Sequence, residues 1–174
     1  MASEKLFLTG NERRFGIDEL IVSKTDRQGR ITYANEVFCR VAGYTEAQLL
    51  GQPHSIIRHP DMPRCVFKLL WDTIEAGREI FAYVLNRASN GDHYWVYAHV
   101  TPNFGPNEEI IGYHSNRRSP EPAAVAAVKP VYAQLLAEEQ RHADPKAGLA
   151  ASIAMVGAFL LSKGVEYDKF VLGL

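Results

Sequence analysis

Apolar and polar positions alternate along the chain in two groups of short runs, which together predict five β-strands. The first group covers residues 19–25 and 30–34, and the second covers residues 80–87, 93–101 and 110–116. Each run is rich in β-branched and aromatic residues and is bounded by turn signals, of which Asn90-Gly91 and Gly105-Pro106 are the clearest. The short turns between neighbouring runs indicate antiparallel pairing within each group.

Apolar residues at helical spacing fill the segment between the two groups of strands. Asn35 can cap a first helix that Gly43 ends, and Thr45 can cap a second helix that ends at Gly51. A longer helix is expected over residues 63–77, because its apolar residues share one face. That face is formed by Val66, Phe67, Leu70, Trp71 and Ile74. The order β-β-α-α-α-β-β-β predicts an α+β fold, a five-stranded antiparallel sheet with helices on one side.

From residue 121 onward the composition changes to that of an alanine-rich helix. Asp144-Pro145 interrupts this pattern, and a second helix is expected over residues 146–162, before a last short helix. The apolar run at 147–161 is shorter than the roughly 20 residues that cross a membrane. We therefore interpret it as a buried or dimer-forming helix and expect no membrane contact.

These patterns divide the chain into three parts. Residues 1–17 are expected to form an N-terminal cap or a flexible arm, residues 18–120 a globular domain, and residues 121–174 a helical extension.

Charge and cysteine content exclude several classes of function. The net charge of −1 predicts no nucleic-acid partner, and Arg117-Arg118 is interpreted as a pair of solvated charges at a strand end. Cys39 and Cys65 form no CxxC pattern, so no zinc site is predicted and a reducing cytoplasm is the expected location. No signal peptide is evident at the N-terminus. Without a phosphate-binding glycine loop, GxSxG or HExxH motif, the protein is not expected to be an enzyme.

The most informative segment is the loop Gly51–Pro63, GQPHSIIRHPDMP, which combines prolines and histidines with an arginine and an aspartate. A plain helix or strand does not need this composition, whereas a binding loop does. The alternative interpretation is a tight turn, in which Asp61 caps the following helix and Arg58 pairs with Asp61.

Several motifs together resemble the PAS domain of bacterial aerotaxis receptors, across residues 21–136. They are ITYANEVF at 31–38, AGYT at 42–45, GQPH at 51–54, RHPDMP at 58–63, LWDTI at 70–74, NGDHYWVYA at 90–98 and GYHSNR at 112–117. AAVKPVYAQL at 126–135 also resembles the segment that leaves that domain toward the transducing part of those receptors.

The resemblance implies noncovalent FAD binding and indicates the residues that would hold the cofactor. Positions matching Arg58, His59 and Asp61 are implicated in that family, and an arginine suits a pyrophosphate because the contact is charge-assisted. Further candidates are polar or flat side chains that could face the flavin ring: His54, Asn35, Asn86, Trp71 and Tyr94.

One segment departs from the family pattern. Ile80 stands where those receptors carry a tryptophan, and Ala82 stands where they carry a glycine. Phe81 is adjacent, but neighbouring residues of a strand face opposite sides of the sheet.

The resemblance therefore predicts a cytoplasmic redox or energy sensor. It would bind FAD, form a homodimer and signal in trans, through the helical extension, to a chemotaxis or other regulatory partner. One alternative is a heme-binding gas sensor with His93 or His99 as axial ligand. The other, which Ile80 favours, is a ligand-free PAS module for dimerisation or docking. A light-driven cysteinyl adduct is not expected, because the short-helix segment at the pocket has no cysteine.

Overall fold

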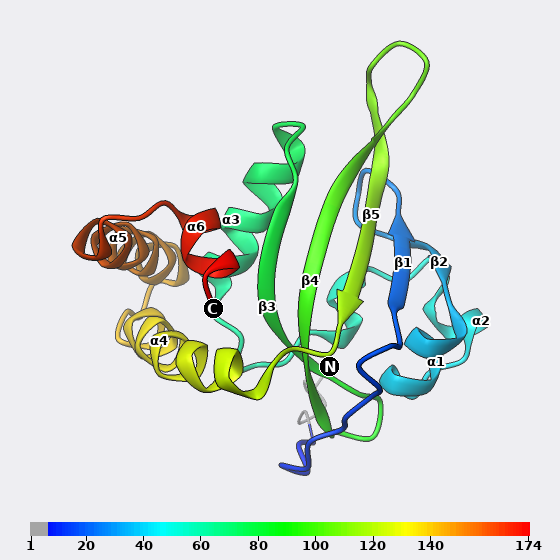
Figure 1. Cartoon of the computed structure of the whole chain (residues 1–174), viewed down its shortest axis with the longest axis horizontal. Coiled ribbons are helices and arrows are strands. Elements are labelled where there is room, and N and C mark those ends of the chain that lie inside the picture. Colours follow the sequence, from blue (N-terminus) through cyan, green and yellow to red (C-terminus); the bar gives the residue numbers. More distant parts are fainter. Residues whose placement is uncertain (1–6) are drawn as a thin grey trace.

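The computed structural model describes residues 7–174, in which a five-stranded antiparallel sheet is flanked by helices (Figure 1). The strands are β1 (Ile21–Thr25), β2 (Ile31–Ala34), β3 (Ile80–Arg87), β4 (His93–Phe104) and β5 (Ile110–Arg118), in the order β2-β1-β5-β4-β3. The helices are α1 (Glu36–Ala42), α2 (Glu46–Leu49), the 3-10 helix η1 (His54–Ile57), α3 (Arg64–Glu75), α4 (Pro122–Gln140), α5 (Pro145–Lys163) and α6 (Tyr167–Leu172). The predicted α+β class and element order are confirmed.

Side-chain hydrogen bonds cap α1 and α2 at the predicted starts of these helices. The Asn35 side chain accepts a hydrogen bond from the Phe38 amide at the start of α1. Thr45 and Gln48 form a reciprocal capping box at the start of α2. Gly43 ends α1 in the left-handed conformation, with φ of 72°.

The two faces of the sheet have different partners. The register of β3 with β4 pairs Ala82 with Ala98 and Val84 with Val96, and these residues belong to the core formed with α1 and α3. On the opposite face, the Tyr132 hydroxyl of α4 donates a hydrogen bond to the Tyr83 carbonyl at 2.7 Å. The extension therefore covers the far face at β3, which the sequence did not predict.

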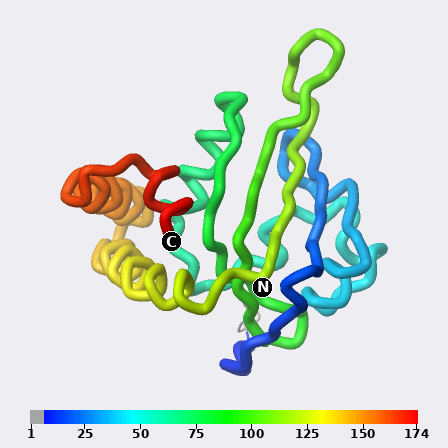
Figure 2. The backbone as a smooth tube through the Cα atoms, in the orientation of Figure 1, coloured from blue at the N-terminus to red at the C-terminus, as the bar shows by residue number. Residues whose placement is uncertain are grey.

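Figure 2 shows the path that produces this arrangement: the chain leaves β5, runs through α4 and returns through α5 and α6 beside β3. Helices α1 and α2 lie at the other side of the sheet, next to β1 and β2 (Figure 1).

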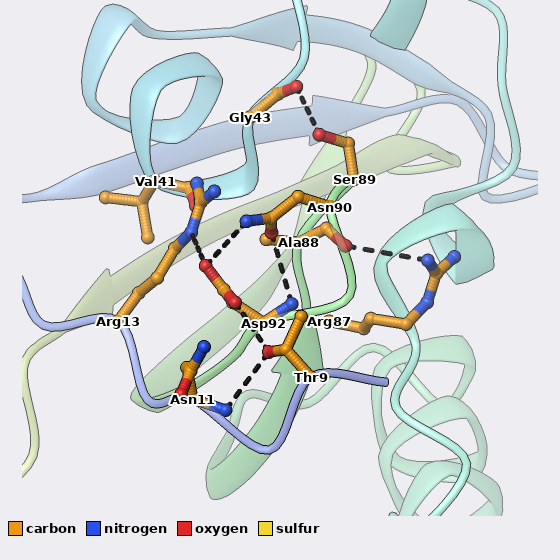
Figure 3. A network of polar contacts seen from close by, with 10 residues as sticks. All are labelled: Thr9, Asn11, Arg13, Val41, Gly43, Arg87, Ala88, Ser89, Asn90 and Asp92. Carbon is orange, nitrogen blue, oxygen red and sulfur yellow. Dashed lines mark hydrogen bonds and ion pairs between the residues drawn. The ribbon is translucent and has the colours of Figure 1, made fainter. Parts of the chain in front are cut away.

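The described part of the N-terminal arm lies against the turn between β3 and β4. Asp92 accepts hydrogen bonds from Thr9 at 2.6 Å and from Arg13 at 2.9 Å, and Asn90 donates a third (Figure 3). These donors, Thr9 first, hold the pKa of Asp92 well below its usual range. Residues 1–6 of the predicted cap or arm lie outside the described residues.

One face of α5 packs against α3 and α4, with Leu149, Met155 and Val156 against the core, while the other face of the apolar run at 147–161 is exposed. Gly148 and Ser152 are the buried residues of this helix. Among the helices of residues 7–174, α5 is the one that is long and apolar enough to cross a membrane. Of its most apolar stretch of 18 residues, 11% is buried.

Two glycines of α5 are expected to respond oppositely to alanine. A Cβ at Gly148 would stand 2.4 Å from the Glu139 carbonyl oxygen of α4, whereas a Cβ at Gly157 meets nothing within 4 Å. We expect Gly148→Ala to lower the free energy of unfolding by about 1–2 kcal/mol through overpacking. Gly157→Ala should raise it by roughly 0.5–1 kcal/mol, because alanine favours helix. Urea denaturation of both variants checks this, and equal stabilisation by both would contradict the close packing of α4 on α5.

Candidate functional site

A buried polar cluster lies between the sheet and η1, and Arg117 of β5 is at its centre. Arg117 is 2% exposed, and its Nη2 donates a hydrogen bond to the Ser23 hydroxyl of β1 at 2.6 Å. Its guanidinium carbon lies 4.3 Å from the centre of the Phe38 ring. Within the described chain, Nε and Nη1 of Arg117 have no hydrogen-bond partner. Burial lowers the pKa of Arg117 to about 10.

The interpretation of Arg117 as a solvated strand-end charge is therefore wrong. Strand β5 continues through Arg118, which is exposed, so the alternation of the strand turns Arg117 inward. A buried charge with unpaired donors is costly unless a further group binds it.

Two of the predicted site residues belong to this cluster. The His54 Nε2 lies 3.2 Å from the Ser23 hydroxyl oxygen, and its ring stacks on Phe38 at 6.0 Å between centres. Tyr94 is completely buried, and its hydroxyl has no partner among the described residues. Burial raises the pKa of Tyr94 above its usual value.

The burial of His54 makes the free energy of unfolding depend on pH. Burial, and then the charge of Arg117, lower the His54 pKa to about 3. The unfolded chain, in contrast, takes up the proton near pH ~6.5. Between these values the unfolded state binds more protons, so the free energy of unfolding should fall by roughly 1 kcal/mol per pH unit as the solution is acidified.

The measurement is urea denaturation from pH 7 to pH 5 of the wild type and of His54→Gln, which should show a flatter dependence. If the free energy of unfolding of His54→Gln depended on pH as steeply as that of the wild type, His54 would not be buried in its neutral form.

Of the predicted residues in the proline-rich loop, His54 belongs to the cluster, whereas Arg58, His59 and Asp61 lie toward the β3 edge of the sheet. Arg58 forms an isolated antiparallel bridge with Asn86, and its guanidinium carbon lies 4.5 Å from the centre of the Phe67 ring. His59 is 6% exposed, and its Nδ1 accepts a hydrogen bond from the Asp61 amide at 3.1 Å. Burial lowers the pKa of Arg58 and of His59. The Asp61 side chain is exposed.

The cap of α3 comes from the extension and not from Asp61, so the tight-turn interpretation is wrong on this point. Glu139 of α4 accepts hydrogen bonds from the Arg64 amide at 3.0 Å and the Cys65 amide at 2.9 Å. Its carboxylate also pairs with the Arg64 side chain at 3.0 Å and accepts from the Ser152 hydroxyl of α5 at 3.1 Å. No hydrogen bond or ion pair joins the side chains of Arg58 and Asp61 within the described chain.

A cleft adjoins this contact. Arg58, Pro60 and Met62 of the loop line it on one side, and Leu136 and Gln140 of α4 line it on the other. The loop predicted to bind FAD therefore faces the first helix of the extension across this cleft.

Two further predicted residues have other partners: the side chain of Asn35 is bound to backbone groups, and Trp71 packs elsewhere in the core. The Asn35 side chain accepts from the amides of Phe38 and Val22 and donates to the Leu20 carbonyl at 2.7 Å. These backbone contacts engage both the oxygen and the nitrogen of its amide. Trp71 packs edge-on against Tyr113, with 5.4 Å between ring centres.

The departure at Ile80 is not compensated by Phe81. Ile80 is 2% exposed and packs with α3. Phe81 lies on the other face, where its ring stacks on His99 at 4.2 Å. His93 shares that face by register, so neither histidine proposed as a heme ligand points toward the cluster around Arg117.

Sequence comparison identifies relatives among signalling proteins. The family described as "PAS fold" matches residues 31–117. The chain is 41% identical over 129 residues to the aerotaxis receptor of Escherichia coli (strain K12), which covers 74% of this chain and 25% of the receptor. It is 34% identical over 97 residues to a nitrogen fixation regulatory protein of Klebsiella pneumoniae, which covers 56% of this chain and 20% of that protein. The resemblance to aerotaxis receptors is confirmed, although the chain spans a quarter or less of these relatives.

Structural comparison supports the same fold. The dark structure of the blue-light photoreceptor Aureochrome1 LOV matches with a TM-score of 0.54 and 25% identity, and the match covers 70% of this chain and 84% of that one.

Proposed function

The chain belongs to the PAS family, and from this premise we propose that it is a sensor domain that binds FAD noncovalently beside Arg117. The observation that carries the proposal is the set of buried polar atoms without partners, namely Nε and Nη1 of Arg117 and the hydroxyl of Tyr94. Buried polar groups are normally paired, so unpaired donors beside flat side chains suit a planar ligand rich in acceptors. The 41% identity to an aerotaxis receptor supports flavin as that ligand.

Each residue of the cluster has a distinct role in this proposal. Arg117 and Tyr94 would donate hydrogen bonds to the ring, while Phe38 and His54 offer flat surfaces. His54 stays neutral at physiological pH, since its pKa is about 3, so its ring can both donate and accept. Arg58 would hold a phosphate at the edge of β3.

Bound FAD would supply reversible uptake of electrons and a proton. A change in which buried group donates to the ring would shift the relative stability of two arrangements of the domain. Couplings of this kind amount to ~1–3 kcal/mol. The contact between Glu139 and the start of α3 is the route by which such a change would reach the extension. In this proposal the protein works in the cytoplasm and signals in trans, as a homodimer, to a regulatory partner.

The test is an absorbance spectrum of freshly purified protein before and after dithionite. Flavin bands that bleach on reduction are expected, and Arg58→Ala and His59→Ala should lose them while keeping the circular dichroism of the folded chain. A single intense Soret band would favour heme instead. A protein that stays colourless after incubation with FAD and hemin would leave only the docking module.

A further inference from the structure

The cleft between the proline-rich loop and α4 has a volume of about 400 Å³, which is within the range of sites for small molecules. Pro60 and Met62 of the loop and Leu136 of α4 form apolar walls. Two polar side chains of its lining, Arg58 and Gln140, make no hydrogen bond or ion pair within residues 7–174. The cleft therefore offers apolar surface together with polar groups that are free to bind a ligand.

The other charged or titratable side chains of the cleft already have partners. Arg64 pairs with Glu139 at 3.0 Å, so the carboxylate of Glu139 does not face the cleft as an unbalanced negative charge. His142 lies 3.0 Å from a carboxylate oxygen of Glu138. Among the lining residues that the structure describes, Arg58 thus carries the positive charge that has no acidic partner. An arginine in this position suits a phosphate, because the contact is charge-assisted.

The cleft also lies close to the cluster around Arg117. Tyr94 of that cluster is paired in register with Asn86 of β3, and Asn86 forms the bridge to Arg58. Two steps between neighbouring strands separate the backbones of Tyr94 and Arg58 by about 10 Å. In FAD a ribityl chain separates the ring from the pyrophosphate, and the adenosine lies beyond the pyrophosphate. A ring at the cluster with its phosphates at Arg58 therefore brings the adenosine to the cleft.

We propose that the cleft receives the adenosine half of FAD and that Gln140 of α4 recognises the adenine base. A glutamine amide pairs with adenine by donating to a ring nitrogen and accepting from the amino group, as it does in the major groove of DNA. Leu136, one turn earlier in α4, and Pro60 supply apolar surface for the base. FAD then contacts the loop and the extension together, whereas FMN, which ends at its phosphate, contacts the loop alone. This inference rests on the proposed function, because it extends the same site.

The experiment is a fluorescence titration of the full chain, freed of bound flavin, with FAD and with FMN. The wild type should bind FAD at least tenfold more tightly than FMN. Gln140→Ala should weaken FAD by about tenfold and leave FMN unchanged, as expected for the loss of one bidentate contact to a base. Arg58→Ala should weaken both flavins, because both carry a phosphate.

The matched control is Gln134→Ala, which removes the same side chain from another exposed position of α4, outside the lining of the cleft. It should keep both affinities of the wild type. Hydrogen exchange gives a second readout at residues 136–140, the last turn of α4. FAD should slow exchange there more than FMN does, and this difference should disappear in Gln140→Ala. Circular dichroism shows whether each variant is folded.

The outcomes separate this inference from the proposed function. FMN that binds the wild type as tightly as FAD, or an unchanged FAD affinity in Gln140→Ala, would overturn the inference and leave flavin binding in place. Binding of neither flavin would overturn the proposed function and this inference with it.

Discussion

Replacing Arg117 by methionine is expected to change flavin binding and stability in opposite directions. The variant should lose at least tenfold in FAD affinity, because two charge-assisted donors are removed from the ring site. The free energy of unfolding of the flavin-free protein should rise by about 1–2 kcal/mol. A buried charge with unpaired donors is often less favourable than an apolar side chain of similar volume.

A loss of FAD affinity together with a gain in stability would distinguish a binding role of Arg117 from a structural one. If Arg117 served only to hold β1 and β5 together through Ser23, its loss would destabilise the flavin-free chain. The matched control is Arg118→Met, which removes the same charge from the exposed neighbouring position.

The measurements are fluorescence titration with FAD and urea denaturation of the flavin-free proteins. Arg118→Met should match the wild type in both. An Arg117→Met protein that keeps FAD with wild-type affinity would show that the ring does not bind at this cluster.

The sequence predicted those features that depend on neighbouring residues. Asn35, Thr45 and Gly43 form their caps within a few positions along the chain, so a local pattern is enough to identify them. His54 and Tyr94 fall within motifs of the aerotaxis-receptor pattern, and the structure brings both into the buried cluster.

Contacts between distant segments could not be predicted in this way. Ser23 and Arg117 are 94 positions apart, and Glu139 and Arg64 are 75 apart, so no local pattern connects them. One signal for Arg117 was present: Tyr113, Ser115 and Arg117 alternate along β5, and the predicted strand ended one residue too early to include it.

The loss of the Glu139 carboxylate is expected to loosen the extension from the core. Glu139→Gln keeps the size of the side chain but removes the charge that receives the Arg64 and Cys65 amides and the Arg64 side chain. We expect the free energy of unfolding to fall by about 3 kcal/mol at pH 7, since buried donors lose a charged acceptor.

The effect should depend on pH in a defined direction. Burial acts to raise the pKa of Glu139, but the bonds from Arg64, Cys65 and Ser152 together lower it below its usual value. The carboxylate therefore stabilises the fold fully above the pKa of the unfolded chain, near ~4.3, and this contribution is lost as the pH falls through the lower folded value. The difference between the wild type and Glu139→Gln should shrink below about pH 4.

Glu138→Gln is the matched control, because Glu138 pairs with Arg141 and His142 within the extension, and within residues 7–174 no hydrogen bond or ion pair joins its side chain to α3. Urea denaturation gives the stability of all three proteins, and hydrogen exchange at the Arg64 and Cys65 amides reports the cap directly. Faster exchange at these amides in Glu139→Gln, with α1 and β1 still protected, would show that the extension detaches while the sensor core remains folded. Unchanged exchange would mean that the carboxylate does not hold α4 to α3, and the proposed route from the FAD loop to the extension would have to be abandoned.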